Sequence, residues 1–349
     1  MRTVSVTTLA RLPPQSGRHP RRVVISASSE RSQVWEVQKE RQVLRFREPS
    51  TGVQVVLIGT MHYNPASIQL VSSTVAGLAA DKTLGALVLE TCPQRWKGTL
   101  AKQPPGSALR SLLDNEFQAA VDAAGGEGTL VLGDQPIDGV MGELKELAAA
   151  TFQDALSPWA GWARLRTDLS RGYLREFAGL PGVPSLAPTD LLMDPRLLLC
   201  LPVSLVRYPL GMLLKSPRFA LPTFGVLAGL DQLLNMVPVG SDVAGSYVAT
   251  PEEIFVTILF ACLDVMQVVL LARCFLIGLL EKRNDILASS VRGACLEAAP
   301  GTAVVAVLGA AHLNGIQARL LREDPLDGVI PGSKAMHADV GSVTNETCL

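Results

Sequence analysis

Short apolar runs alternate with longer amphipathic stretches along most of the chain. The clearest run is QVVLIGT at residues 54–60, and similar runs occur at GALVLE (85–90), within GTLVLGDQPI (128–137) and at TAVVAVLGA (302–310). Such short, β-branched runs are typical of strands buried on both faces of a parallel sheet. Their alternation with helical spacing predicts an α/β domain over residues 50–322, with a mainly parallel or mixed central sheet flanked by helices.

The pattern changes over residues 150–250, which are rich in proline, leucine and arginine. We interpret this region as a largely helical insertion. Residues 197–214 are apolar but contain two prolines and an arginine, which makes them a poor membrane span. Residues 254–280 are long enough to span a bilayer, but Asp264 and Arg273 place a charge on each side of the centre. A buried or interfacial helix is therefore favoured there, with membrane association through either stretch as the alternative.

Composition excludes one class of partner. The 349 residues are 48% apolar, enough for a sizeable core, and 31 basic residues against 32 acidic residues give a formal charge of −1. A protein that holds nucleic acid needs a surplus of positive charge, so no nucleic-acid partner is expected. The six cysteines show no CxxC spacing and are interpreted as reduced thiols.

The two ends of the chain differ from the rest. Residues 1–29 carry five arginines, several serines and threonines, and no acidic residue. This composition predicts a transit peptide within residues 1–35, for a plastid ahead of a mitochondrion, with an uncleaved disordered tail as the alternative. Residues 323–349 are polar and glycine-rich and are expected to form a flexible tail.

One motif is written twice. The sequences VVLIGTMH and VAVLGAAH each run from an apolar strand through a glycine, Gly59 or Gly309, to a histidine three residues later, His62 or His312. A third strand ends on Glu90. Ligands of parallel sheets bind at the carboxyl ends of the strands, so these three side chains are expected to meet there.

Two imidazoles and one carboxylate suit a divalent ion such as manganese, cobalt or zinc, and three protein ligands leave room for water. Metal-bound water makes hydrolysis the natural reaction class. Arg95, five residues after Glu90, is expected to orient that carboxylate or to bind an anionic group of the substrate.

In order along the chain, GTMH, LVLETCPQRW, LGDQPI, KRNDILA and VLGAAHLNGI resemble the TraB family, whose relatives include bacterial pheromone-shutdown proteins and Tiki metalloproteases. The resemblance implies one pocket that contains His62, Glu90 and His312, with Asp134 nearby. It also implies that Arg283 and Asn284 join this pocket. Two departures alter the charge there: Gln135 stands where related proteins have arginine, and Lys282 where they have an acidic residue.

Two functions follow as alternatives. The first is a metal-dependent, peptidase-like hydrolase of an organelle, in which Glu90, Arg95, Arg283 and Asn284 act in catalysis. The second is a non-catalytic protein that sequesters a peptide or acts as an adaptor on an organelle membrane. Peptides or proteins are the expected substrates or ligands, and the sequence defines neither the substrate nor the oligomeric state.

Overall fold

The computed structural model describes residues 36–157, 159–215, 241–243, 246–248, 250–322 and 337–339. The predicted transit peptide, residues 1–35, therefore lies outside the described residues. The predicted tail also lies outside them, apart from one short strand at residues 337–339.

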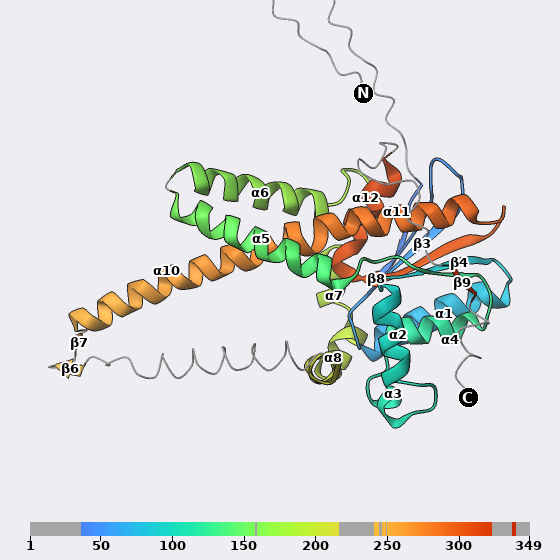
Figure 1. Ribbon diagram of the computed structural model, residues 1–349, viewed down its shortest axis with the longest axis horizontal. Coiled ribbons are helices and arrows are strands. Elements are labelled where there is room, and N and C mark those ends of the chain that lie inside the picture. The colour runs from blue at the N-terminus through green and yellow to red at the C-terminus, as the bar shows by residue number, and fades with distance from the viewer. Residues whose placement is uncertain are drawn as a thin grey trace, which may run out of the picture. The chain divides into compact units, whose positions relative to one another are not determined.

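A seven-stranded mixed sheet forms the centre of the fold, in the order β1-β2-β3-β8-β4-β5-β9 (Figure 1). The four central strands are parallel, and β1, β2 and β9 pair antiparallel at the two edges. The expected α/β fold with a mainly parallel or mixed sheet is thus confirmed. The strands are β1 (Gln38–Glu40), β2 (Val43–Arg47), β3 (Gln54–Thr60), β4 (Leu84–Leu89), β5 (Thr129–Leu132), β8 (Ala303–Gly309) and β9 (His337–Asp339).

The apolar runs become strands because both faces of the sheet are covered. Every residue of β8 is buried, and six of the seven residues of β3 are buried. On one face, alternate residues of these strands pack with α11 and α12, and on the other face they pack with α1 and α4. Two apolar layers therefore sandwich the sheet.

Helices cover both faces of the sheet (Figure 1): α1 (Pro65–Ala80) and α4 (Glu116–Ala124) lie on one face, and α11 (Lys282–Glu297) and α12 (Leu313–Leu321) lie on the other. The connecting segments contain the shorter helices α2 (Pro93–Lys102), α3 (Ala108–Leu112) and α7 (Pro188–Leu192) and the 3-10 helix η2 (Ala310–His312).

The predicted insertion over residues 150–250 is largely helical where it is described. It includes the end of α5 (Ile137–Leu156), together with α6 (Ala160–Glu176) and α8 (Pro195–Lys215). A small hairpin follows, formed by β6 (Ser241–Val243) and β7 (Ser246–Val248). The helix α10 (Pro251–Arg273) then continues through the π-helix η1 (Cys274–Glu281) directly into α11.

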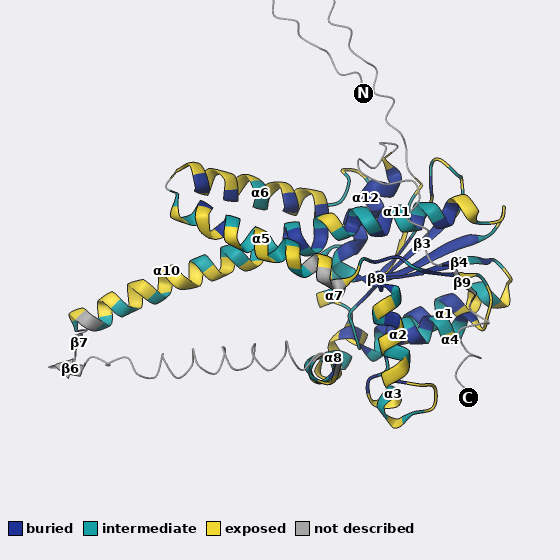
Figure 2. Ribbon diagram, in the orientation of Figure 1, coloured by how far each residue is buried: buried dark blue, intermediate teal, exposed yellow. Residues whose placement is uncertain are grey.

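Burial of residues 254–280, one of the two arrangements favoured from the sequence, is wrong for most of their length. Along α10 large apolar side chains are exposed to solvent (Figure 2), although both α10 and η1 contact α5 and α6, α10 through Arg273 at its end. The exposed side chains are Ile254, Phe255, Ile258, Leu259, Leu263, Val265, Val268 and Leu271. Because residues of a helix are spaced by 100°, these positions point to every side of α10, so the helix has no polar face of the kind an interfacial helix needs.

Candidate functional site

The site forms where four parallel strands end together. Thr60 of β3 pairs with Gly309 of β8, and Leu89, the last residue of β4, pairs with Leu132 of β5 and with a residue of β8 two positions before Gly309. The segments that follow these strands carry His62, His312, Glu90 and Asp134. The repeated strand-Gly-x-x-His motif therefore delivers its two histidines to one edge of the sheet.

Glu90 lies at the centre of this group and is 5% exposed. One carboxylate oxygen, Oε2, accepts a hydrogen bond of 2.6 Å from the backbone N–H of Gly309. The other, Oε1, lies 2.6 Å from Nη2 of Arg283 and 3.2 Å from Nε2 of His312. Burial alone would raise the pKa of this carboxyl group, but the positive charges and hydrogen bonds of His312 and Arg283 outweigh it and hold the pKa well below its usual range.

His62 approaches the same carboxylate from β3. Its Nδ1 contacts Oε1 of Glu116, at the start of α4, and Oε2 of Glu116 accepts from the backbone N–H of Tyr63 at 3.2 Å. Burial lowers the pKa of His62, but the hydrogen bond and charge of Glu116, with a contribution from Glu90, raise it overall to about 9. The imidazole therefore carries a positive charge at neutral pH.

His312 is held in a similar way from the opposite side. It ends the short helix η2, is 5% exposed, and its Nδ1 lies 2.6 Å from Oδ1 of Asn284 in α11. Both histidines thus have Nδ1 against an oxygen atom and Nε2 on the side of Glu90.

Two glycines leave the space that this arrangement needs. A Cβ atom at Gly309 would lie 3.2 Å from Nε2 of His62 and 3.3 Å from Oε2 of Glu90. A Cβ atom at Gly59 would lie 2.8 Å from Cδ2 of Leu313, at the start of the helix that follows His312. Gly309 permits the close approach of the polar groups, whereas Gly59 permits close packing of α12 on the sheet.

Arg95 does not orient Glu90 as the sequence suggested. Its guanidinium pairs with Oδ2 of Asp134, and Arg283 is the residue that contacts both carboxylates, Glu90 and Asp134. The distance from Nη2 of Arg283 to Oδ2 of Asp134 is 2.5 Å. The reason is position: Arg95, in the first turn of α2, contacts the aspartate that follows β5, whereas Arg283 reaches the glutamate that follows β4 from α11.

Sequence reasoning missed two carboxylates that hold the site. Glu116 holds His62, and Glu176, the last residue of α6, holds Asn284. Neither stands next to a motif, and the only local signal is Asn115, whose side chain caps α4 and so fixes where Glu116 begins that helix.

His62, Glu90 and His312 are residue types that bind divalent cations, and the contacts of the two histidines resemble those of metal-binding histidines. A metal-binding histidine usually donates Nδ1–H to an oxygen acceptor and leaves Nε2 for the metal, which is how His62 and His312 are held. Among the described residues, no three His, Cys, Asp or Glu side chains are drawn together as a ready ligand cluster. Instead, Arg283 supplies positive charge to Glu90.

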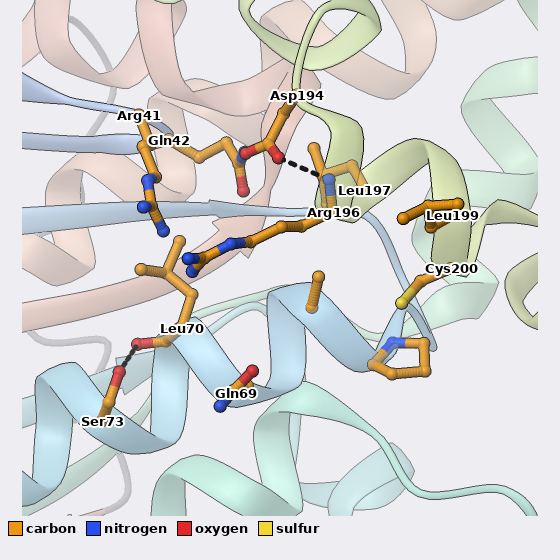
Figure 3. Close-up of a pocket in the computed structure, with 12 residues that line it drawn as sticks. Arg41, Gln42, Gln69, Leu70, Ser73, Asp194, Arg196, Leu197, Leu199 and Cys200 are labelled. Carbon is orange, nitrogen blue, oxygen red and sulfur yellow. Dashed lines mark hydrogen bonds between the residues drawn. The ribbon is translucent and has the colours of Figure 1, made fainter.

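A separate cavity of about 420 Å³ lies between α1 and the start of α8 (Figure 3). Its wall is mostly apolar, with two arginines, Arg41 and Arg196, reaching over Leu70. None of its residues belongs to the group around Glu90. The cavity therefore takes no part in the candidate site.

No protein-family model matches the chain, and no curated protein sequence matches it. The resemblance to the TraB family rests on the motifs and on the strand ends that carry them.

Proposed function

We propose that this protein is a divalent-metal-dependent hydrolase of the TraB type, with His62, Glu90 and His312 as the metal ligands. Peptides or proteins are the substrate class that the resemblance implies. Manganese, cobalt and zinc all accept this combination of two imidazoles and one carboxylate.

One observation supports the proposal above the others. Nε2 of His312 lies 3.2 Å from a buried, ionised carboxylate, and Nε2 of His62 borders the same space beside Gly309, while each Nδ1 contacts an oxygen of a helix side chain. A packing role for each histidine alone would not account for two histidines, from two copies of one motif, beside the same carboxylate.

The other side chains would act on the substrate. A bound metal ion would supply a Lewis acid and a water molecule of lowered pKa. Arg283, 14% exposed at its side chain, would bind a carbonyl oxygen or a carboxylate of the substrate once Glu90 turns to the metal. Arg95, about one third exposed, has Asp134 as its partner and would widen this positive surface. Asn284 would keep His312 in place.

The first experiment measures metal content after equal exposure to manganese, cobalt and zinc. The wild type is compared with the His62→Ala/His312→Ala double variant, and with His337→Ala as a control that removes a histidine belonging to neither GxxH motif. Near-stoichiometric metal in the wild type and the control, but not in a folded double variant, is the expected result. Absence of metal from the wild type would overturn the proposal.

Hydrolysis is tested next, on a peptide library with the metal-loaded protein. Glu90→Gln keeps the shape of the side chain and removes its charge, so it is expected to abolish both metal binding and cleavage. Cleavage that survives in Glu90→Gln would contradict the assigned chemistry. Stoichiometric metal without cleavage of any peptide would instead favour a binding protein.

We also propose, as a second candidate, a non-catalytic adaptor attached to an organelle membrane through α10. This helix has 23 residues, which corresponds to about 34 Å of helix against about 30 Å of bilayer core. It is the one described helix that is long and apolar enough to cross a membrane. Asp264 opposes insertion by about 3 kcal/mol, while the surrounding leucine, isoleucine, phenylalanine and valine residues favour it.

Membrane attachment is tested by alkaline carbonate extraction of isolated plastids and mitochondria. Retention in the pellet supports a span through α10, and release into the soluble fraction excludes one. The same fractions test our proposal that the basic, serine-rich residues 1–35 direct the protein to a plastid, with a mitochondrion as the alternative.

A further inference from the structure

A chain of buried polar contacts leads from the candidate site to the helix α6. The Nδ2 atom of Asn284 donates to Oε2 of Glu176, and Oδ1 of the same amide lies 2.6 Å from Nδ1 of His312. Glu176 and Asn284 are both fully buried. Neither side chain can therefore exchange its partner for water.

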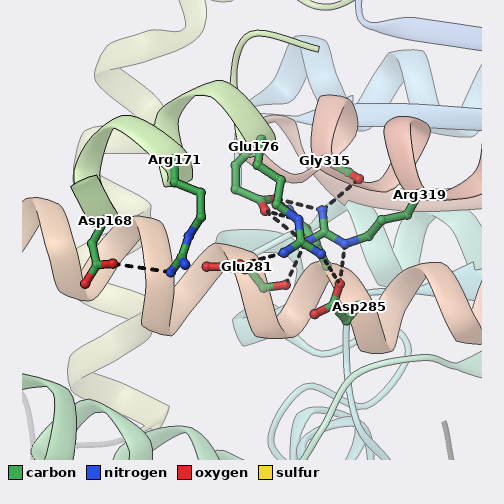
Figure 4. A network of polar contacts seen from close by, with 9 residues as sticks. Asp168, Arg171, Glu176, Glu281, Asp285, Gly315 and Arg319 are labelled. Atoms are coloured by element: carbon green, nitrogen blue, oxygen red, sulfur yellow. Dashed lines mark hydrogen bonds and ion pairs between the residues drawn. The ribbon is translucent and has the colours of Figure 1, made fainter. Parts of the chain in front are cut away.

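Arg319, in α12, donates to both carboxylate oxygens of Glu176. Its Nη2 and Nη1 atoms donate to the two carboxylate oxygens at 2.8 and 2.9 Å, and its Nε donates to Asp285 (Figure 4). An ionised carboxylate accepts hydrogen bonds and donates none. In the hydrogen bond between the two side chains, Glu176 is therefore the acceptor and the Asn284 amide N–H is the donor.

This direction determines how the amide of Asn284 is turned. If the amide were flipped, its oxygen would face the carboxylate of Glu176, and two acceptors would be buried against each other. The amide oxygen is therefore left for His312, whose Nδ1 must carry a proton to bond with it.

When the ring of His312 is neutral, it would have, without Glu176, a second arrangement in which both ring nitrogens make hydrogen bonds. Its Nε2 could donate to Glu90, 3.2 Å away, while Nδ1 accepted from a flipped Asn284. That form would turn an N–H, in place of a lone pair, toward the proposed metal position. Glu176 therefore determines which of the two tautomers of His312 is favoured.

We propose that Glu176 is a positioning residue, which fixes the proton of His312 on Nδ1 through the amide of Asn284 and so frees Nε2 for a ligand. The inference extends the proposed metal site, but the position of the proton can be measured without any metal. Gly315 contributes space, because a Cβ atom there would overlap both Oε2 of Glu176 and Nδ2 of Asn284.

The test is the tautomer of His312, read from the ring nitrogen shifts of the metal-free protein by NMR, under conditions in which the ring is neutral. Three proteins are compared: wild type, Glu176→Met and Arg319→Lys. Glu176→Met removes the acceptor while Arg319 keeps Asp285. Arg319→Lys disturbs the same buried network but leaves a cation beside Glu176.

The wild type and Arg319→Lys are expected to show the Nδ1–H form, and Glu176→Met a shift to a mixture with the Nε2–H form. An unchanged tautomer in Glu176→Met overturns the inference, and so does an equal shift in both variants, which would indicate general loosening. If Glu176→Met does not fold, Gly315→Ala serves instead, because its methyl group separates Glu176 from Asn284.

Metal binding separates this inference from the proposed function. If the wild type binds metal, Glu176→Met is expected to bind it about 10- to 100-fold more weakly than Arg319→Lys. If the wild type binds none, the hydrolase proposal fails, while the tautomer measurement still decides the role of Glu176.

Discussion

The contact between His62 and Glu116 changes the pKa of the histidine, and this change can be measured. The pKa of His62 is raised to about 9, because the hydrogen bond and charge of Glu116 outweigh burial. We expect Glu116→Gln to lower this pKa toward the ordinary value near 6.5. An NMR titration of the His62 ring protons measures the change, with Glu127→Gln as an exposed control. A pKa that stays near 9 in Glu116→Gln would show that another group holds the charge.

The sign of the shift also sets how stability and metal affinity depend on pH. The charged form of His62 stabilises the folded protein, so its contribution is complete below about pH 6.5 and is lost as the pH rises through about 9. Metal needs the neutral ring, so the apparent metal affinity should rise with pH up to about 9. In Glu116→Gln the rise should end near the lowered pKa, and cobalt absorption spectra recorded at several pH values test both curves.

Arg283 competes with a metal ion for Glu90. Replacing it with methionine leaves two buried carboxylates with less positive charge, which should destabilise the metal-free protein by about 3–5 kcal/mol. Added metal should restore most of this stability, bind no more weakly than in the wild type, and support no hydrolysis. Arg95→Met is the control, because Arg95 contacts Asp134 and not Glu90. A metal affinity that falls only in Arg283→Met would mean that the arginine shapes the site instead of competing for it.

At the end of β8, Gly309 lets His62 and Glu90 come close to the backbone. A single methyl group at Gly309 should disturb this arrangement. In Gly309→Ala the new carbon lies 3.2 Å from Nε2 of His62, so we expect the histidine to move and metal affinity to fall by at least tenfold. Gly293→Ala in α11 is the matched control, because its Cβ meets no atom within 4 Å and alanine favours a helix by up to about 1 kcal/mol. Thermal unfolding and metal titration of both variants test the prediction, and equal metal affinity would contradict it.

The strands β3, β4 and β8 could be predicted because burial on both faces leaves an almost continuous apolar run in the sequence. The meeting of His62, Glu90 and His312 follows from the same pattern, since parallel strands end at one edge. The residues that hold these side chains could not be predicted. Glu116 and Glu176 come from helices whose docking depends on tertiary packing, and no local spacing in the sequence records it.

The exposure of α10 could not be predicted for a related reason. An apolar helix has the same sequence whether protein or lipid surrounds it, and the charges of Asp264 and Arg273 favoured protein. The structure pairs Arg273 with Asp154 and Asp168, at the junction with α5 and α6, so this charge lies at the end of the exposed helix. Only Asp264 remains as a charge along its middle.

The continuous helix from α10 to α11 joins the apolar segment to the candidate site. Arg273 ends α10, and Arg283 lies ten residues further along the same helical course, which corresponds to about 15 Å. If α10 lies in a bilayer, the site is therefore held close to the membrane surface.

We expect Phe255→Ser, Leu259→Gln and Leu263→Gln, combined in one variant, to release the protein from membranes. Because these side chains are exposed, the free energy of unfolding of the variant should lie within about 1 kcal/mol of the wild-type value. The variant should also bind metal with the same affinity as the wild type. Vesicle flotation, thermal unfolding and metal titration measure the three properties, with Leu280→Gln as the control that enters the protein core. A loss of stability in the α10 variant as large as in Leu280→Gln would show that α10 packs against protein, and the membrane candidate would then be abandoned.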